Sequence, residues 1–168
     1  MMREIGIFDN YLNLIEALRG HGAFLVTGRD RPNPMTIGWA TLGIIWGKPI
    51  LSVLVRPSRH SFLLINSHEE FCVCVPPPSA MLKELIFCGT KSGRDFDKFA
   101  ECGLSAEAGV KIKVPHIAEC AMHYECKIVH KNYIISDKLD SVVQTQYYPH
   151  GDFHAIYYGE VQGAFLRE

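Results

Sequence analysis

The sequence has few of the features that mark membrane, secreted or nucleic-acid-binding proteins. Its longest apolar stretch is interrupted by Lys48 and Pro49, so no run reaches the length that crosses a bilayer. The first residues lead into mixed polar sequence rather than the apolar segment of a secretory signal. The formal net charge is −1, which gives no electrostatic footprint for nucleic acid or an anionic membrane. We therefore expect a cytoplasmic protein that binds neither nucleic acid nor a membrane.

Metal-binding and disulfide patterns are also missing. There is no C-x-x-C and no H-E-x-x-H, and the 8 histidines are scattered along the chain. In a reducing compartment the 6 cysteines are expected to remain thiols, and Cys72 and Cys74 are expected to lie on one face of a strand as small buried apolar residues. We expect no metal site.

The common phosphate and nucleophile motifs are absent as well. The chain has no G-x-x-x-x-G-K-[ST], no G-x-G-x-x-G after a strand and no G-x-S-x-G elbow. Residues 89–93 resemble the first of these only superficially. If the protein is an enzyme, its chemistry therefore belongs to a cofactor, held on a different scaffold.

The patterning that is present predicts a strand-rich chain. At 168 residues, 48% hydrophobic and 21% charged, it is expected to form one domain over residues 1–168. Strands without regular strand–helix alternation favour a mainly β fold with peripheral helices, an antiparallel barrel. Strands are predicted at 23–27, 41–46, 50–55, 71–75, 117–130 and 154–165, and helices at 10–18, 58–65, 79–86, around 96–99, and at 137–146, where a strand also fits.

The sequence also predicts particular loops, helix starts and one exposed strand face. A polar loop is expected at 29–34, turn residues at 47–49, and helix N-caps at Ser58 and Ser79. Alternation along 117–130 predicts a half-buried antiparallel strand. Its inward residues would be Met122, Tyr124, Cys126 and Ile128, and its outward residues His123, Glu125, Lys127 and Val129.

The stretch 33–61 carries the first chemical signal. An apolar hairpin ends in Arg56-Pro57-Ser58-Arg59-His60-Ser61, where cations and hydroxyls meet the start of a helix. That arrangement suits an anion, most often a phosphate. Two arginines on a solvated helix start remain an equal alternative. The glycine- and hydroxyl-rich stretch 88–95 also has two interpretations. It can approach a ligand closely, or it can simply connect two helices.

Four motifs together resemble the flavin reductase-like family, and within it the flavoredoxin-type branch. They are Asn33-Pro34-Met35-Thr36-Ile37-Gly38-Trp39, the 56–61 turn, GTKSGRDFDKF at 89–99 and GDFHAIYYGEV at 151–161. They occur in the family's order and cover nearly the whole chain. The resemblance implies an antiparallel split β-barrel of the FMN-binding type, a homodimer, and one FMN per subunit.

The resemblance also assigns residues to that cofactor. Thr36, Ile37, Trp39, Ala40 and Thr41 would lie along the flavin ring; Arg56, Ser58, Arg59 and Ser61 would receive the ribityl chain and phosphate; Thr90, Lys91, Ser92 and Gly93 would form a second cofactor loop. His154 matches a histidine near the nicotinamide site of reductase members. Because Phe153 separates it from Asp152, a packing role for His154 stays open.

The implied function is that of a flavoprotein oxidoreductase. FMN would take a hydride from NADH or NADPH and pass electrons to free flavin, ferric iron or a protein. A slot for the stacked rings could be lined by Trp39, Trp46, Tyr148 and Tyr157. The alternatives are an electron carrier with little reductase activity, and a barrel of this fold that binds another ligand or only a partner protein.

Overall fold

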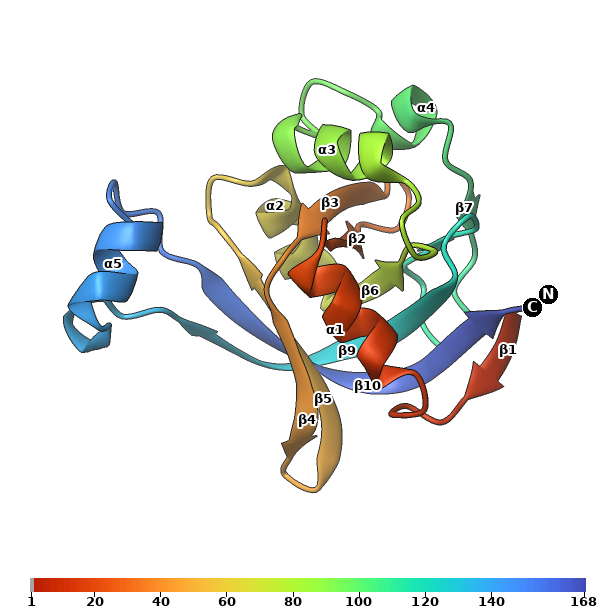
Figure 1. The fold of residues 1–168 in the computed structure, drawn as a ribbon, viewed down its shortest axis with the longest axis horizontal. Coiled ribbons are helices and arrows are strands. Elements are labelled where there is room, and N and C mark those ends of the chain that lie inside the picture. The colour runs from red at the N-terminus through yellow and green to blue at the C-terminus, as the bar shows by residue number, and fades with distance from the viewer. Residues whose placement is uncertain (1) are drawn as a thin grey trace.

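One antiparallel sheet organises the molecule, which is described for residues 2–168 in a computed structural model. Its strand order is β3-β2-β6-β9-β10-β5-β4, with β1 added along the end of β10 (Figure 1). Within the described chain β3 and β4 end this order without pairing with each other, so the sheet is a split barrel rather than a closed one. The strands are β1 (Met2–Ile5), β2 (Ala23–Thr27), β3 (Asn33–Ile37), β4 (Ala40–Ile45), β5 (Lys48–Val55), β6 (Glu70–Val75), β9 (Met122–Tyr133) and β10 (Ala155–Arg167), while β7 (Ala106–Glu107) pairs only with β8 (His116–Ile117). The predicted fold class is confirmed.

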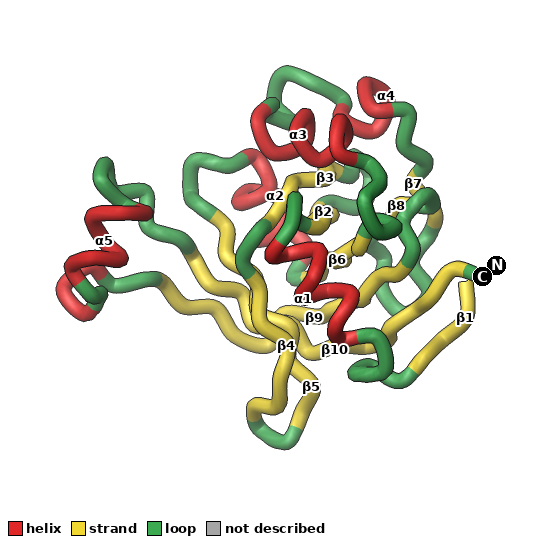
Figure 2. The backbone as a smooth tube through the Cα atoms, viewed as in Figure 1, coloured by secondary structure: helices red, strands yellow, loops and turns green. Residues whose placement is uncertain are grey.

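Helices lie around the sheet rather than between successive parallel strands. Helices α3 and α4 lie above β2 and β3, α1 crosses beside the barrel, and α5 stands apart at the far end of β9 and β10 (Figure 2). The helices are α1 (Tyr11–Arg19), α2 (His60–His68), α3 (Leu82–Thr90), α4 (Lys98–Cys102), the 3-10 helix η1 (Ser136–Lys138) and α5 (Ser141–Tyr147). Among residues 2–168 no helix is both long and apolar enough to cross a bilayer.

The core has two layers because the central strands are buried on both faces. On β2, Leu25 faces the barrel interior with Phe71 and Tyr157, whereas Phe24 faces the layer under α3 and α4. Alternate side chains of a strand point to opposite faces, so a strand covered on both sides needs apolar residues at every position. This explains the continuous apolar runs of β2 and β6.

The β4–β5 hairpin turns one residue earlier than predicted. Trp46 and Gly47 both have positive φ, at 54° and 69°, and Ile45 pairs with Lys48. This is a two-residue turn of the kind whose twist matches that of the strands. Lys48 and Pro49, expected in the turn, instead begin β5.

Two predicted helix starts are wrong. Ser58 does not cap α2, because its hydroxyl is bonded to Asp152 and Arg59 takes the N-cap position. Ser79 does not cap α3 either, since the chain makes a turn with positive φ at Ser79 and Met81 before the helix begins. Helix α2 runs on to His68 and α3 to Thr90, so part of the expected loop at 88–95 is helical.

Other boundaries move for local reasons. The predicted loop at 29–34 stops earlier, because Asn33 and Pro34 pair with β2. Asp97 caps α4 through its side chain, which leaves Phe96 outside the helix. The predicted helix at 137–146 becomes η1 followed by α5, which Asp140 caps. The pairing of β1 with β10 was not predicted.

The strand predicted at 117–130 differs most from the structure, both in its bounds and in the burial of its residues. Ile117 belongs to β8 and β9 begins at Met122. Its first five residues are buried on both faces, including His123 and Glu125, which were expected to face solvent. The segment between α4 and β9 folds back over this face of the sheet and covers it. Beyond that cover the predicted alternation holds for Lys127, Ile128 and Val129, and it ends at His130, which is exposed like Val129.

The cysteines lie as expected. All six of them, each within the described chain, are free thiols, and five are buried. Cys72 and Cys74 share one face of β6, with their sulfur atoms 3.6 Å apart.

Candidate functional site

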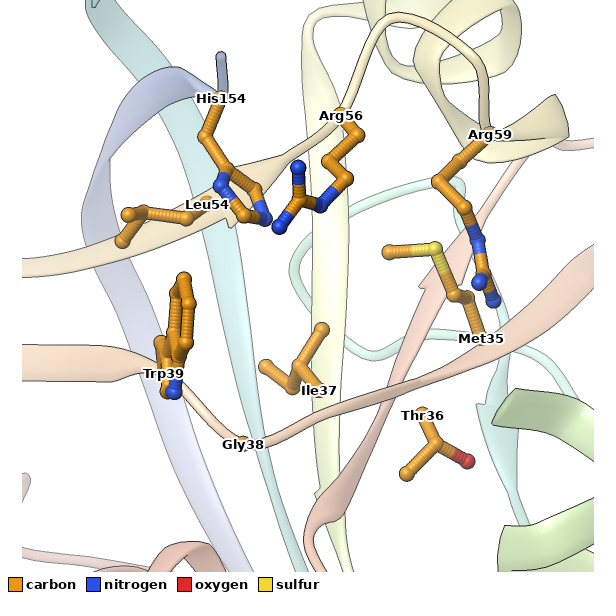
Figure 3. Close-up of a pocket in the computed structure, with 9 residues that line it drawn as sticks. All are labelled: Met35, Thr36, Ile37, Gly38, Trp39, Leu54, Arg56, Arg59 and His154. Carbon is orange, nitrogen blue, oxygen red and sulfur yellow. The ribbon is translucent and has the colours of Figure 1, made fainter. Parts of the chain in front are cut away.

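A pocket of about 240 Å³ lies at the end of β3, where the chain continues through Gly38 and Trp39. We call it the Trp39 pocket, and it is lined by Met35, Thr36, Ile37, Gly38, Trp39, Leu54, Arg56, Arg59 and His154. In Figure 3, Trp39, Leu54 and His154 lie at one end, and Met35 and Arg59 lie at the other. The sequence segments 33–39, 56–61 and 151–161 therefore meet in space, although Met35 and His154 are 119 positions apart along the chain.

His154 forms one wall of the Trp39 pocket as a neutral ring. Its side chain is 8% exposed and its ring centre lies 5.1 Å from that of Trp39. Burial lowers its pKa to about 4, helped by the charge of Arg56 and partly opposed by Asp152. The Tyr148 hydroxyl lies 2.7 Å from Nδ1, and burial raises the pKa of Tyr148, so the phenol stays protonated and donates this bond. The remaining nitrogen, Nε2, then carries the proton and is a hydrogen-bond donor.

Arg56 holds the loop that carries His154. Its guanidinium donates to the carbonyl oxygens of Tyr147, at 2.8 Å, and Asp152, at 2.9 Å. It also lies over the Tyr148 ring, 4.9 Å from the ring centre. Most of the donor capacity expected for a phosphate is thus directed to loop 147–152, and Arg56 positions His154 and Tyr148.

Ser58 is also engaged with this loop. Its hydroxyl donates to Asp152 Oδ2 at 2.6 Å, and its backbone N–H donates to Oδ1 at 3.3 Å. Asp152 reaches this position with a left-handed backbone, at φ 55°. A carboxylate therefore occupies the donors that were predicted for a phosphate at Ser58.

A second pocket of about 120 Å³ adjoins the first and shares Met35 and Arg59 with it. We call it the Lys98 pocket. Its lining contains four cationic side chains and no acidic one among the residues that the structure describes around it. The lining residues are Asn33, Met35, Ser58, Arg59, His60, Ser61, Thr90, Lys91, Ser92, Gly93, Arg94 and Lys98.

Lys98 is the most buried of these cations. The residue is 3% exposed, and its Nζ donates to the carbonyl oxygens of Cys88, at 2.9 Å, and Pro34, at 3.1 Å. Burial lowers its pKa to about 8, which leaves it mostly charged at neutral pH. Arg59 donates to the Gly89 carbonyl at 2.9 Å, and burial followed by the charge of Arg56 lowers its pKa. Arg94 donates to the Ser58 carbonyl at 3.0 Å.

The predicted hydroxyl ligands are already hydrogen bonded within the protein. Thr36 donates to Leu85 O at 2.6 Å and Thr90 to Ile86 O at 2.7 Å. Ser61 accepts from the Asn33 amide at 2.9 Å, and Ser92 accepts from the Arg94 N–H at 3.2 Å. These bonds shape the pocket walls.

Gly93 is required by packing at the same wall. A Cβ atom there would collide with the Asn33 amide oxygen and with the ring of His60. The glycine brings residues 90–94 close against β3 and the start of α2.

Several expected residues lie outside both pockets. Ala40 and Thr41 continue into β4, where the Thr41 hydroxyl is bonded to that of Ser52. Trp46, 61% exposed, is at the hairpin tip. Tyr157 is in the barrel core and donates to Asn66 Oδ1 at 3.0 Å. Lys91 does line the Lys98 pocket, as the resemblance implied.

Sequence reasoning missed Lys98 and Arg94 as site residues. Both lie within the 89–99 motif, which was the available signal, but a lysine at the start of a short helix ordinarily faces solvent. Met35, Gly38, Leu54, Asn33 and His60 are the other lining residues not predicted individually.

Comparison with known proteins identifies relatives. The sequence profile of the "Flavin reductase like domain" matches residues 19–168. An uncharacterized protein of Archaeoglobus fulgidus is 32% identical over 143 residues, which cover 85% of this chain and 78% of that protein.

Solved structures share the fold. A flavoredoxin of Desulfovibrio vulgaris (Miyazaki F) has a TM-score of 0.69 at 22% identity, over 87% of this chain and 69% of its own. An FMN-binding domain of a flavin reductases-like enzyme from Shewanella baltica gives 0.68 at 21% identity, over 99% and 77%. The NADH:FAD oxidoreductase SgcE6 of Streptomyces globisporus C-1027 gives 0.65 at 18%, over 98% and 88%. At these identities the likeness shows the fold.

Proposed function

The chain belongs to the flavin reductase-like family, as its motifs predicted, and on that premise we propose that it is a flavoprotein oxidoreductase that binds FMN across the Trp39 and Lys98 pockets. The observation that carries the proposal is the junction of these pockets at Met35 and Arg59. It creates one groove with an aromatic end, where Arg56 is bonded to backbone carbonyl oxygens, and an end lined by four cationic side chains.

The residues of the groove suit the two ends of FMN. The flavin ring is flat and largely apolar, and Trp39, Ile37 and Leu54 offer an apolar surface of that kind. The phosphate carries about two negative charges near neutrality. Arg59, Lys91, Arg94 and Lys98 line the other end, and α2 starts there without a side-chain cap. The Phe62 N–H donates to the Arg59 carbonyl, so the amides available to an anion are those of His60 and Ser61.

When bound, FMN would supply the redox chemistry, accepting a hydride from NADH or NADPH and yielding electrons to a second acceptor such as free flavin, ferric iron or a protein. The side chains of this chain bind, orient and exclude water. Neutral His154 would offer its Nε2–H to a ligand held beside Trp39. Because its pKa is near 4, it acts as a hydrogen-bond donor and not as a proton source near neutral pH.

We also propose that the protein works as a homodimer. The β4–β5 hairpin presents large apolar side chains that a monomer leaves in water: Ile44 is 62% exposed and Trp46 61%. Exposed apolar groups gathered at one hairpin tip favour a protein contact. Light scattering after gel filtration measures the mass, and a monomer at working concentration would contradict this part of the proposal.

The first test is the colour and flavin content of the purified protein. We expect yellow protein, or colourless protein that becomes yellow and quenches flavin fluorescence when FMN is added, with one FMN per chain. Colourless protein that ignores added FMN would overturn the proposal. Riboflavin is the matched control, because it has the ring without the phosphate and should bind more weakly.

The second test separates the reductase from an electron carrier. The flavin-loaded protein is mixed without oxygen with NADH or NADPH, and the flavin absorbance is followed. Rapid bleaching by either nucleotide supports a reductase. Bleaching by dithionite, and by neither nucleotide, supports an electron carrier. Candidate electron acceptors are then tested by mixing each with the chemically reduced protein.

A further inference from the structure

A second group of polar side chains is buried outside the two pockets of the groove. The His116–His123 cluster consists of His116 on β8 with His123 and Glu125 on β9, and these residues are 2%, 0% and 0% exposed. It lies in the core layer between the sheet and the segment that leads from α4 to β9, and it lines neither described pocket. The proposed FMN chemistry makes no use of it.

The two imidazoles are held in one orientation by carboxylates. Their rings are stacked, with centres 4.0 Å apart and planes inclined by 10°. Nε2 of His116 lies 3.2 Å from Glu107 Oε2, and Nε2 of His123 lies 3.2 Å from Glu125 Oε1. Nδ1 of each ring is buried and has no hydrogen-bond partner in the described part of the chain. Two unpaired ring nitrogens in a buried place are costly unless something binds them.

The donor atoms are close enough to share one partner. A ring nitrogen of each histidine and a carboxylate oxygen of Glu125 all lie within 4.8 Å of one another. Cys74 is directly opposite His123 in the β6–β9 pairing, so its thiol shares that face of the sheet. We propose that His116, His123 and Glu125 bind a divalent transition-metal ion such as Zn²⁺, with Cys74 on the same face as the candidate fourth ligand.

The donor set selects the class of ion. Imidazole nitrogen, carboxylate oxygen and thiolate are the ligands of Zn²⁺ and its neighbours, whereas Mg²⁺ and Ca²⁺ prefer oxygen alone. Ligands at about 2.1 Å from a tetrahedral ion stand about 3.4 Å apart, so donor atoms that lie within 4.8 Å of one another must close in by up to about 1.4 Å. The stacked rings must also rotate, because the lone pair of each imidazole lies in its own ring plane. Burial also lowers the pKa of His116, which keeps its ring neutral and its lone pair available.

The ion would fasten the covering segment to the sheet. Glu125 already accepts backbone N–H groups from Val110 at 2.8 Å, from Lys111, and from Ile112 at 3.1 Å. His116 comes from the same segment, while His123 and Glu125 come from β9. A shared ion would therefore join the two layers and raise the melting temperature. This role is independent of the proposed FMN site.

The test uses full-length protein that has been treated with a chelator and dialysed. Calorimetric titration with Zn²⁺ should show one ion per chain and a higher Tm. His116→Gln should weaken binding at least tenfold. The matched control is His130→Gln, which removes an exposed histidine of β9 and should bind as the unaltered protein does. Equal binding by both variants, or no binding by the unaltered protein, would overturn the proposal.

Co²⁺ provides a second measurement that needs no variant. Held by nitrogen, oxygen and sulfur ligands in a tetrahedral site, it should give strong visible absorption that Zn²⁺ displaces. Weak absorption typical of a hydrated ion would contradict the site, even if His116→Gln fails to fold.

Discussion

The Trp39 pocket and the Lys98 pocket share a wall, and each holds a buried base whose charge at neutral pH differs from that of the other. Burial lowers the pKa of His154 from 6.5 to about 4, and the charge of Arg56 lowers it further, so the imidazole is neutral. Burial lowers the pKa of Lys98 from 10.5 to about 8, so the ammonium group keeps most of its charge and donates to two carbonyl oxygens. Similar burial therefore leaves different charges at neutral pH, because an imidazole starts from a much lower pKa than an amine.

The difference gives the groove its polarity. A ligand that is uncharged at one end and anionic at the other can lie in only one direction along it, with its charge beside Arg59 and Lys98. The contrast can be broken at either end of the groove.

The largest effect concerns the buried neutral histidine. The pKa of His154 is near 4 in the folded protein and about 6.5 when unfolded, so the unfolded chain binds more protons between these values. Stability is therefore present above pH 6.5 and falls as the pH drops through this window, by about 3 kcal/mol at pH 4. Urea unfolding at pH 7 and pH 4 measures it. His154→Gln should lose this share of the pH dependence and His150→Gln should not; an unchanged slope in His154→Gln would place the effect elsewhere.

Arg59→Ala tests the cationic end. Loss of one charge-assisted contact costs about 1.5–3 kcal/mol, which weakens FMN binding roughly ten- to a hundredfold. Equilibrium dialysis with FMN measures the affinity, and circular dichroism checks the fold. Arg19→Ala removes an exposed arginine from the last turn of α1 and is the matched control. Unchanged affinity in Arg59→Ala would remove Arg59 from the site.

Lys98 predicts how FMN affinity changes with pH. Because its pKa is near 8, the ammonium group deprotonates as the pH rises from 7 to 9, and phosphate binding should weaken by about tenfold. Lys98→Met should bind FMN weakly throughout and show no such decline. The control is Lys113→Met, which removes an exposed lysine outside both pockets and should show the same decline in FMN affinity as the unaltered protein. A Lys98→Met protein with the full decline would show that another group titrates.

Trp39→Ala tests the aromatic end and should have a smaller effect than the variants above. Loss of one stacking contact costs about 0.5–1.5 kcal/mol, or roughly two- to twelvefold in FMN affinity. Riboflavin should lose affinity by the same factor, because this contact is to the ring. Trp46→Ala is the control, as Trp46 is at the exposed hairpin tip. A loss confined to FMN would contradict a ring contact at Trp39.

What the sequence determined is local. Alternating and continuous apolar runs place β2, β4, β5 and β6 nearly as observed, since strand formation and burial follow from the side-chain pattern along a few residues. The four motifs identify the family and bring Arg59, Lys91 and His154 to the groove.

Only the tertiary structure decided how those side chains are used. Ser58 and Arg56 bond to residues more than ninety positions away, and Lys98 is buried against Pro34. His123 was expected in solvent, but the covering segment buries it and stacks His116 on its ring. Pairings of this kind depend on strand register and on which segment covers which face, and no local pattern of polarity encodes either. The sequence therefore identified the residues, and long-range packing set their pKa shifts, their hydrogen-bond partners and their roles.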